Sequence, residues 1–201
     1  MSEADFVPTR LPFGSFGKKG VGWWGMLCLV ATEACLFGYL LFSYAFTAIQ
    51  MGPSWQPAAP PSVKLALPNT IILLVSSVAV WFGERGIKRG RRGQLLAGVG
   101  AAIVLGAVFI AVQLKEWSNK PYRINTSGYA SHYFTITGFH MAHVALGLLA
   151  LIAVFLWGAL GYFDRQRNTA VLVTSVYWHF VDVVWLCVFS AFYIAPYLMT
   201  P

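Results

Sequence analysis

The amino-acid sequence predicts an all-α integral membrane protein built as a bundle of five transmembrane helices. Of its 201 residues, 58% are hydrophobic and only 10% are charged. A soluble domain carries about a quarter charged residues, so a chain this poor in charge cannot cover a water-facing surface. Five mainly apolar stretches each reach the roughly 20 residues that a helix needs to cross the hydrocarbon core. We therefore expect residues 1–201 to form a single membrane domain.

Charged residues set the limits of the five stretches. The predicted helices lie at about 22–49, 65–83, 95–114, 133–162 and 170–197. Pro68 falls in the first turn of the second helix, where a missing N–H group is tolerated. The connector 51–67 holds four prolines and is expected to be ordered or extended rather than helical. Residues 1–21 form a polar tail that lacks the apolar core of a cleavable signal peptide.

The basic residues predict the orientation of the bundle. Ten of the 14 lysine and arginine residues lie in the N-terminal tail and in the second and fourth connections, and four lie on the other side. Because cytoplasmic loops are enriched in these residues, we expect the N-terminus inside and the C-terminus outside. The densest run, residues 85–92, can also contact anionic lipid headgroups. The net charge of +7 is thus a topology signal and requires no nucleic-acid partner.

Polar side chains within the apolar stretches are the candidate functional residues, because an ionisable group at mid-bilayer costs at least ~2.5–3.5 kcal/mol. Two acids lie there, one in the first stretch and one in the last. Two pairs spaced three apart share a helix face, one in the fourth stretch and one in the last. The predicted intramembrane cluster, which could handle protons or lipid, is Glu33, Asn69, His140, His143, His179 and Asp182.

Three interpretations of this cluster follow from the residue types. It can be a hydrogen-bonded group that holds the helices together. Glu33 can instead exchange protons, or His140, His143 and His179 can ligate haem or copper. Ligation is disfavoured because a dihaem core needs four histidines on paired helices, and we place His132 in a loop at the membrane edge. We therefore predict no metal site in this chain.

The remaining reactive side chains point to no catalysis. The three cysteines form no Cys-x-x-Cys pair, and apolar packing in the interior is the expected role of Cys28, Cys35 and Cys187. The sequence has no nucleophile elbow, no phosphate-binding glycine loop and no His-Glu-x-x-His motif. We predict no catalytic residues and no enzyme activity of the chain on its own.

Four segments, in this order, resemble subunit III of the haem–copper terminal oxidases. The segments are WWGMLCLVATEACLFG (23–38), LPNTIILLVSS (67–77), TGFHMAHVALG (137–147) and YWHFVDVVWLCVFSAFY (177–193). The resemblance extends over residues 22–197. Mitochondrial members have seven helices, and this chain resembles the shorter bacterial form that lacks the first two.

The resemblance implies an accessory subunit without redox centres. Its complex would be a proton-pumping cytochrome c oxidase that reduces O2 to water in aerobic respiration, in a bacterial inner membrane. Haem and copper would lie in partner subunits I and II. Subunit III of this family packs against subunit I, binds phospholipid in a cleft and supports proton uptake. Glu33, His143, His179 and Asp182 match positions near that cleft.

Other functions remain open at the level of sequence. The chain could serve a quinol oxidase, or be the subunit-III-like protein of a nitric oxide reductase system. The electron donor is set by other subunits and cannot be read from this chain. A proton-coupled transporter using Glu33 and Asp182 is a different class, disfavoured because the chain shows no inverted repeat and no paired broken helices.

Overall fold

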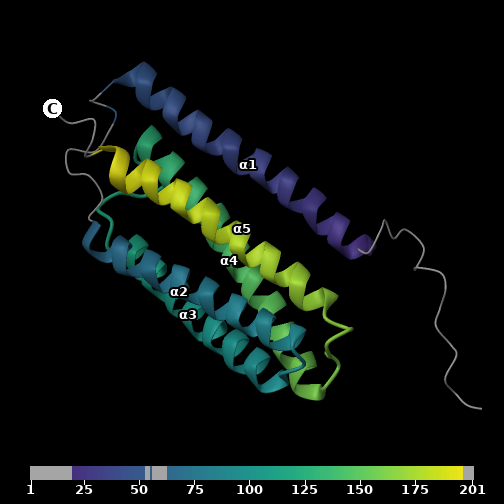
Figure 1. Ribbon diagram of the computed structural model, residues 1–201. Coiled ribbons are helices and arrows are strands. Elements are labelled where there is room, and N and C mark those ends of the chain that lie inside the picture. The colour runs from purple at the N-terminus through teal and green to yellow at the C-terminus, as the bar shows by residue number, and fades with distance from the viewer. Residues whose placement is uncertain (1–19, 53–54, 56–62, 197–201) are drawn as a thin grey trace, which may run out of the picture.

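The computed structural model describes residues 20–52, 55 and 63–196, and these form five long helices (Figure 1). The helices are α1 (Val21–Met51), α2 (Val63–Lys88), α3 (Arg92–Ser118), α4 (Gly128–Leu160) and α5 (Thr169–Phe189), the last continued by a π-helical turn, η2 (Ser190–Ile194). All five are long and apolar enough to cross a membrane. The predicted all-α membrane fold with five helices is therefore confirmed for the described residues, and its orientation stays a prediction.

Every helix begins earlier than its apolar stretch predicted. The largest difference is at α4, which begins at Gly128 rather than near residue 133 and therefore includes His132, a residue expected in a loop. The Ser127 side chain accepts from the Ala130 N–H group and caps this start. Polar residues at the membrane edge thus extend the helices beyond the hydrocarbon core. The same helix ends at Leu160, before a left-handed Gly161 (φ 88°).

The prediction for Pro68 was wrong in position. Because α2 begins at Val63, Pro68 lies in the helix interior rather than its first turn. It therefore removes one backbone hydrogen bond that the helix would otherwise make. The four prolines expected to keep the preceding connector extended, Pro53, Pro57, Pro60 and Pro61, lie outside the described residues.

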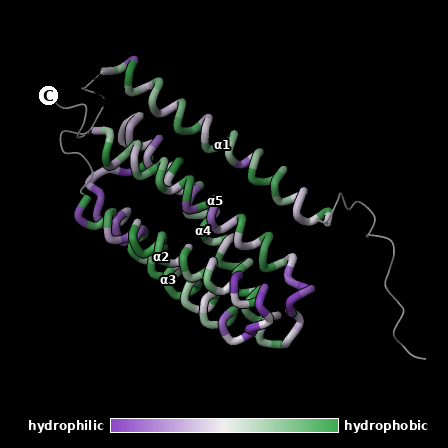
Figure 2. Tube along the Cα trace, viewed as in Figure 1, coloured by the Kyte–Doolittle hydropathy of each residue, from purple (hydrophilic) through white to green (hydrophobic). Residues whose placement is uncertain are grey.

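The helices pack unequally. α2 and α3 form the closest pair, α5 packs against α2 and α4, and α1 contacts the bundle through α5 and α4. Figure 1 shows α1 at one edge of the molecule, on the far side of α5 from α2 and α3. Only Phe37 and Tyr44 of α1 are buried. Hydrophobic residues run along all five helices and hydrophilic ones gather near their ends (Figure 2).

Glycines allow the closest contacts in the bundle. A Cβ atom at Gly98 would lie 2.5 Å from the Ala79 carbonyl oxygen and 2.6 Å from the Gly83 nitrogen, so α2 and α3 touch through their backbones. Gly106 and Gly147 make room for the fully buried Trp178 ring, since a Cβ at either would come within 2.8 Å of it. Small residues therefore set the core geometry here, as is usual between membrane helices.

Two tryptophan–hydroxyl bonds fix the register of α5 on α2. The Trp178 indole donates to Ser76 Oγ at 3.0 Å and the Trp185 indole donates to Thr70 Oγ1 at 2.9 Å. Both indoles are buried, so each N–H group would lose its only route to a hydrogen bond if the helices slid.

The expectation of buried cysteines was wrong. Cys28, Cys35 and Cys187 are all exposed on the outer surface of the helices. On a membrane helix, an outward position faces lipid, which solvates a thiol as well as an apolar core does. Interior packing therefore does not explain these residues.

The bundle has two ends, which we call the basic end and the opposite end. The basic end carries the α2–α3 turn, residues 89–91, and the start of α5. The opposite end carries the α3–α4 loop, residues 119–127, and the end of α5.

Candidate functional site

The six predicted site residues fall in three separate places. Glu33 and His143 meet between α1 and α4, His140 and Asn69 lie in the core, and His179 and Asp182 on α5 face α2. Asp182 is 4% exposed and lies beside the Ser77 hydroxyl of α2. The two acids, Glu33 and Asp182, therefore have different neighbouring side chains.

Glu33 and His143 form a hydrogen-bonded pair that holds α1 to α4. His143 Nε2 lies 3.0 Å from Glu33 Oε2, and His143 Nδ1 lies 2.6 Å from the Phe139 carbonyl oxygen. A carbonyl only accepts, so Nδ1 carries a hydrogen. The contact through Nε2 then needs one further proton, on either the imidazole or the carboxyl. Whichever partner holds that proton, the pair as a whole is neutral, which lowers its cost in a membrane.

His140 sits in an aromatic box at the centre of the bundle. Its ring centroid lies 4.8 Å from that of Trp185, 5.9 Å from Phe109 and 6.5 Å from Phe37. Asn69 joins the same layer by donating to the Phe109 carbonyl at 3.3 Å. Neither His140 nitrogen has a hydrogen-bond partner among the described residues. These aromatic contacts give the imidazole a packing role.

A chain of hydrogen bonds runs from the middle of α5 to the basic end. His179 Nδ1 lies 2.5 Å from Ser77 Oγ, and His179 Nε2 lies 3.3 Å from Ser175 Oγ. Ser175 donates in turn to Glu84 Oε2 at 2.6 Å. Lys88 completes the chain by donating to the other Glu84 oxygen. We call the hydrogen-bonded residues Ser77, His179, Ser175, Glu84 and Lys88, together with the neighbouring buried acid Asp182, the polar relay.

The polar relay reaches the molecular surface at two points. At the basic end it borders a pocket of about 380 Å³, lined by Gly20, Trp23, Glu84, Lys88, Thr169, Leu172 and Val176. Deeper in the membrane, a hollow of about 350 Å³ is bounded by Ser77, Val78, Trp81 and His179. We call the first of these the basic-end pocket. The relay thus has an end open to ligands and a side open toward lipid.

Of the polar relay, only His179 and Asp182 were predicted from the sequence as site residues, and the other four members were not. Glu84 was treated as a loop acid, but it is helical and joins α2 to α5. Spacing carried the missing signal: Ser77 and Glu84 are seven apart on α2, and Ser175, His179 and Asp182 follow a four-and-three pattern on α5. Each set occupies a single helix face. A polar face on α2 and a second one on α5 would have predicted that these two helix faces pack against each other.

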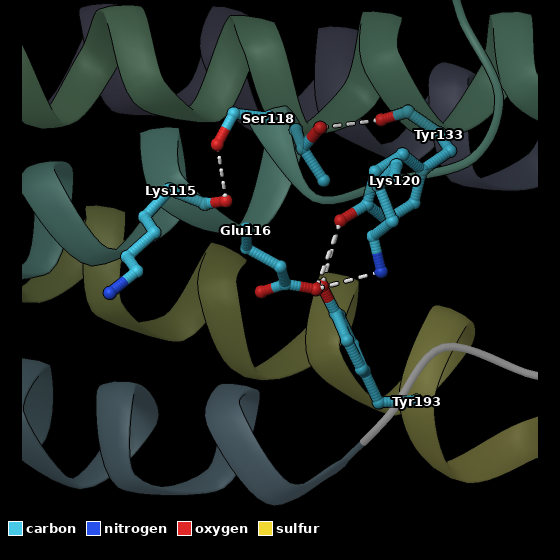
Figure 3. A network of polar contacts seen from close by, with 7 residues as sticks. Lys115, Glu116, Ser118, Lys120, Tyr133 and Tyr193 are labelled. Atoms are coloured by element: carbon cyan, nitrogen blue, oxygen red, sulfur yellow. Dashed lines mark hydrogen bonds and ion pairs between the residues drawn. The ribbon is translucent and has the colours of Figure 1, made fainter.

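A second polar network lies at the opposite end, around Glu116 of α3 (Figure 3). Its Oε1 accepts from Tyr193 at 2.6 Å, from Tyr133 at 3.2 Å and from Lys120 at 2.9 Å. The Lys120 ammonium also lies 5.0 Å from the centre of the Tyr133 ring. Burial, followed by the charge of Glu116, raises the pKa of the nearby loop residue Tyr122 to about 12. Glu116, also expected in a loop, is a buried helical residue.

These features define the class of protein: a multi-pass α-helical membrane protein with hydrogen-bonded polar groups inside the bundle. No three His, Cys, Asp or Glu side chains of the described ranges are grouped so as to hold a metal ion. Residues 13–197 match the sequence model of the family described as cytochrome c oxidase subunit III. The chain belongs to the cytochrome c oxidase subunit III family, as the resemblance of its four segments indicated.

Named relatives agree with this assignment. The chain is 32% identical to cytochrome c oxidase subunit 3 of Synechocystis sp. over 185 residues, which cover 90% of this chain and 78% of the relative. It is 32% identical to the Thermostichus vulcanus protein of that name, with 85% of each chain covered. It is 33% identical to the Anopheles gambiae protein, with 85% of this chain and 68% of the relative covered.

Family membership states the coarse function. The protein is a non-catalytic subunit of cytochrome c oxidase, a complex that also contains subunits I and II. Cyanobacterial and insect relatives are similar to nearly the same degree. The bacterial location therefore stays a prediction.

Proposed function

We propose that this chain covers subunit I of a proton-pumping cytochrome c oxidase, holds a phospholipid at its basic end and assists proton uptake there. The observation that carries the proposal is the polar relay, because hydrogen bonds join His179, which lies three residues from the buried Asp182, to a charged pair beside a pocket. Buried ionisable chains of this kind are costly and mark proton relays in membrane proteins. The names of the relatives favour cytochrome c over quinol as the electron donor.

The hydrogen-bond directions allow the relay to carry protons. Ser175 donates to Glu84, so its oxygen is free to accept from His179 Nε2–H. The neutral ring then accepts at Nδ1 from the Ser77 hydroxyl. All donors between Ser77 and Glu84 point toward the basic end. Protonation of Glu84 turns its carboxyl into a donor and permits the reversed order, in which Glu84 donates to Ser175, Ser175 donates to His179 Nε2 and His179 Nδ1–H donates to Ser77.

The basic-end pocket offers groups for a phospholipid headgroup. Lys88 can bind a phosphate and Glu84 can bind an ammonium group, so their combination favours a zwitterionic headgroup. Trp23 on α1 has the aromatic character typical of the headgroup level. The acyl chains would follow the apolar hollow beside Val78 and Trp81. A lipid seated here would cover the relay and limit its access to water.

The test compares the oxidase complex with and without this chain. We expect nearly unchanged haem and copper spectra, a reduced initial rate of O2 reduction and faster loss of activity during sustained turnover. Asp182→Asn and His179→Gln should reproduce part of this loss. Asp164→Asn, a change at an exposed loop acid, is the matched control. An unaltered time course without the chain would refute the proposed role, and loss of the haem spectrum would indicate assembly instead.

A further inference from the structure

Unpartnered polar atoms are concentrated in one short stretch of α3, near the opposite end. Ten buried side-chain nitrogen and oxygen atoms of the described residues make no hydrogen bond, and four of them belong to residues 113–117. They are both polar atoms of the Gln113 amide, Oε2 of Glu116 and Nε1 of Trp117. Gln113 is 0% exposed and Glu116 is 5% exposed. Buried polar groups without partners are rare in folded proteins, so four within little more than a helical turn need an explanation.

The contacts between α3 and α4 locate this group of atoms. Glu116 meets Tyr133 through a hydrogen bond, and Phe109 meets His140 through ring contact. Gln113 lies between Phe109 and Glu116 on the same buried face of α3. Its amide therefore lies between these two layers, inside the bundle. Figure 3 shows the unbonded Glu116 oxygen directed away from Lys120 and Tyr193.

We infer that residues 113–117 line an internal water-binding site at the opposite end of the bundle. The atoms comprise donors on Gln113 and Trp117 and acceptors on Gln113 and Glu116. A bare cation would need acceptors alone and an anion would need donors alone, whereas water donates and accepts. Internal water typically makes about three hydrogen bonds to polar groups left unsatisfied by the protein. The set fits one or two water molecules.

Water at this site changes what the Glu116 network can do. Lys120 closes the network from the α3–α4 loop, and only 10% of its side chain is exposed. A water on the second oxygen of Glu116 gives the carboxylate an inner exchange partner, separate from the polar relay. The opposite end then contains a glutamate–lysine pair with bound water, rather than an ion pair without water that only holds the helices together. This inference does not depend on the proposed role of the relay.

The first experiment is X-ray hydroxyl-radical labelling of the intact oxidase complex, read out by mass spectrometry. Radiolysis of bound water generates the radical in place, so a buried ring next to water is labelled quickly. Tyr133 and Trp178 are both 0% exposed, and Trp178 bonds directly to Ser76. We expect Tyr133 to be labelled at least about tenfold faster than Trp178. Equal rates would overturn the inference.

The second experiment uses Gln113→Leu in the same complex. If water bridges the amide to its neighbours, the leucine variant loses that water and leaves the neighbouring polar groups without a hydrogen bond. Labelling of Tyr133 then falls toward that of Trp178, and the thermal midpoint of unfolding drops. If the site is dry, the change removes an uncompensated amide, so the midpoint rises. The matched control is Gln94→Leu on the same helix, which loses only the bond to the Phe82 carbonyl. A raised midpoint for Gln113→Leu would reject the water site.

Discussion

The two ends of the bundle use the same pair of residues in opposite ways. Glu84 and Lys88 at the end of α2 form a glutamate–lysine ion pair spaced four apart, and so do Glu116 at the end of α3 and Lys120 in the loop that follows. At the basic end the side chains are 17% and 49% exposed, whereas at the opposite end they are 6% and 10% exposed. The same four-residue spacing in the sequence thus gives an accessible pair in one place and an enclosed pair in the other.

The neighbours of each pair account for the difference. Glu84 is contacted by Ser175, a small hydroxyl that leaves the carboxylate beside a pocket. Glu116 is covered by Tyr133 and Tyr193, whose rings also enclose the ammonium group of Lys120. The four-residue spacing of glutamate and lysine therefore determines whether such a pair forms. The residues contributed by other helices determine whether it meets water.

The largest expected effect concerns which compartment each end faces. A reporter active only in the cytoplasm should work when inserted in the turn at residues 89–91, and one active only outside should work in the loop at residues 119–127. Basic residues are retained on the cytoplasmic side during insertion, which is the physical reason. Reporter activity at both sites is the measurement. The reverse pattern would exchange the ends and move the proposed proton entry to the wrong side.

Removing the lysine of each pair should separate the two environments. Lys120→Met leaves the buried Glu116 carboxylate without its cation and should cost about 3 kcal/mol of stability. Lys88→Met changes an exposed pair and should cost about 0–1 kcal/mol. The thermal midpoint of the detergent-purified complex measures both. Equal losses would show that the enclosure of Glu116 has no energetic consequence.

Removing a hydroxyl from each network should give smaller changes in the same order. Tyr193→Phe deletes the 2.6 Å bond to Glu116 and should cost about 1.5–3 kcal/mol, as bonds to charged groups do. Ser175→Ala deletes a bond of equal length to Glu84, but water can replace it, so about 1 kcal/mol or less is expected. Tyr39→Phe, on the exposed surface of α1, serves as the control for thermal unfolding.

The smallest effect is a dependence on alkaline pH. Burial and the Glu116 charge raise the pKa of Tyr122 from 10.0 to about 12, so the folded state favours the neutral phenol. This contribution to stability is complete below pH 10 and is lost as the pH rises toward 12. Tyr122→Phe should remove that part of the midpoint-against-pH curve. Tyr162→Phe, an exposed loop change, should leave the curve as it is, and an unchanged curve for Tyr122→Phe would contradict the assignment.

The sequence predicted the fold well because its signals are local. An apolar run long enough to cross a bilayer has few alternatives to a helix, so all five helices could be found from hydropathy. The exact helix ends could not, because capping and ion pairing extend them through polar residues such as Glu84. Glu84 and Glu116 were placed in loops for that reason, since charge alone marks the membrane edge without marking the end of a helix.

The site was predicted only in part because its partners are distant in sequence. Glu33 and His143 were both identified as candidates, but nothing in either segment indicates that they bond across 110 residues. Ser175 was overlooked because serine is common in membrane helices and its importance depends on Glu84, 91 residues away. Spacing along one helix could reveal which residues share a face, whereas the meeting of two faces depends on contacts between helices, such as the bond from Trp178 of α5 to Ser76 of α2.

The bond between Glu33 and His143 has a consequence for biogenesis. During synthesis α1 enters the bilayer long before α4 has been made, because the two residues are 110 positions apart. Glu33 must therefore cross the membrane without its partner, and a neutral carboxylic acid is the form that does so at lower cost. When α4 follows, His143 supplies the hydrogen-bond partner that Glu33 lacked until then. The bond between α1 and α4 can therefore form only after most of the chain has entered the membrane.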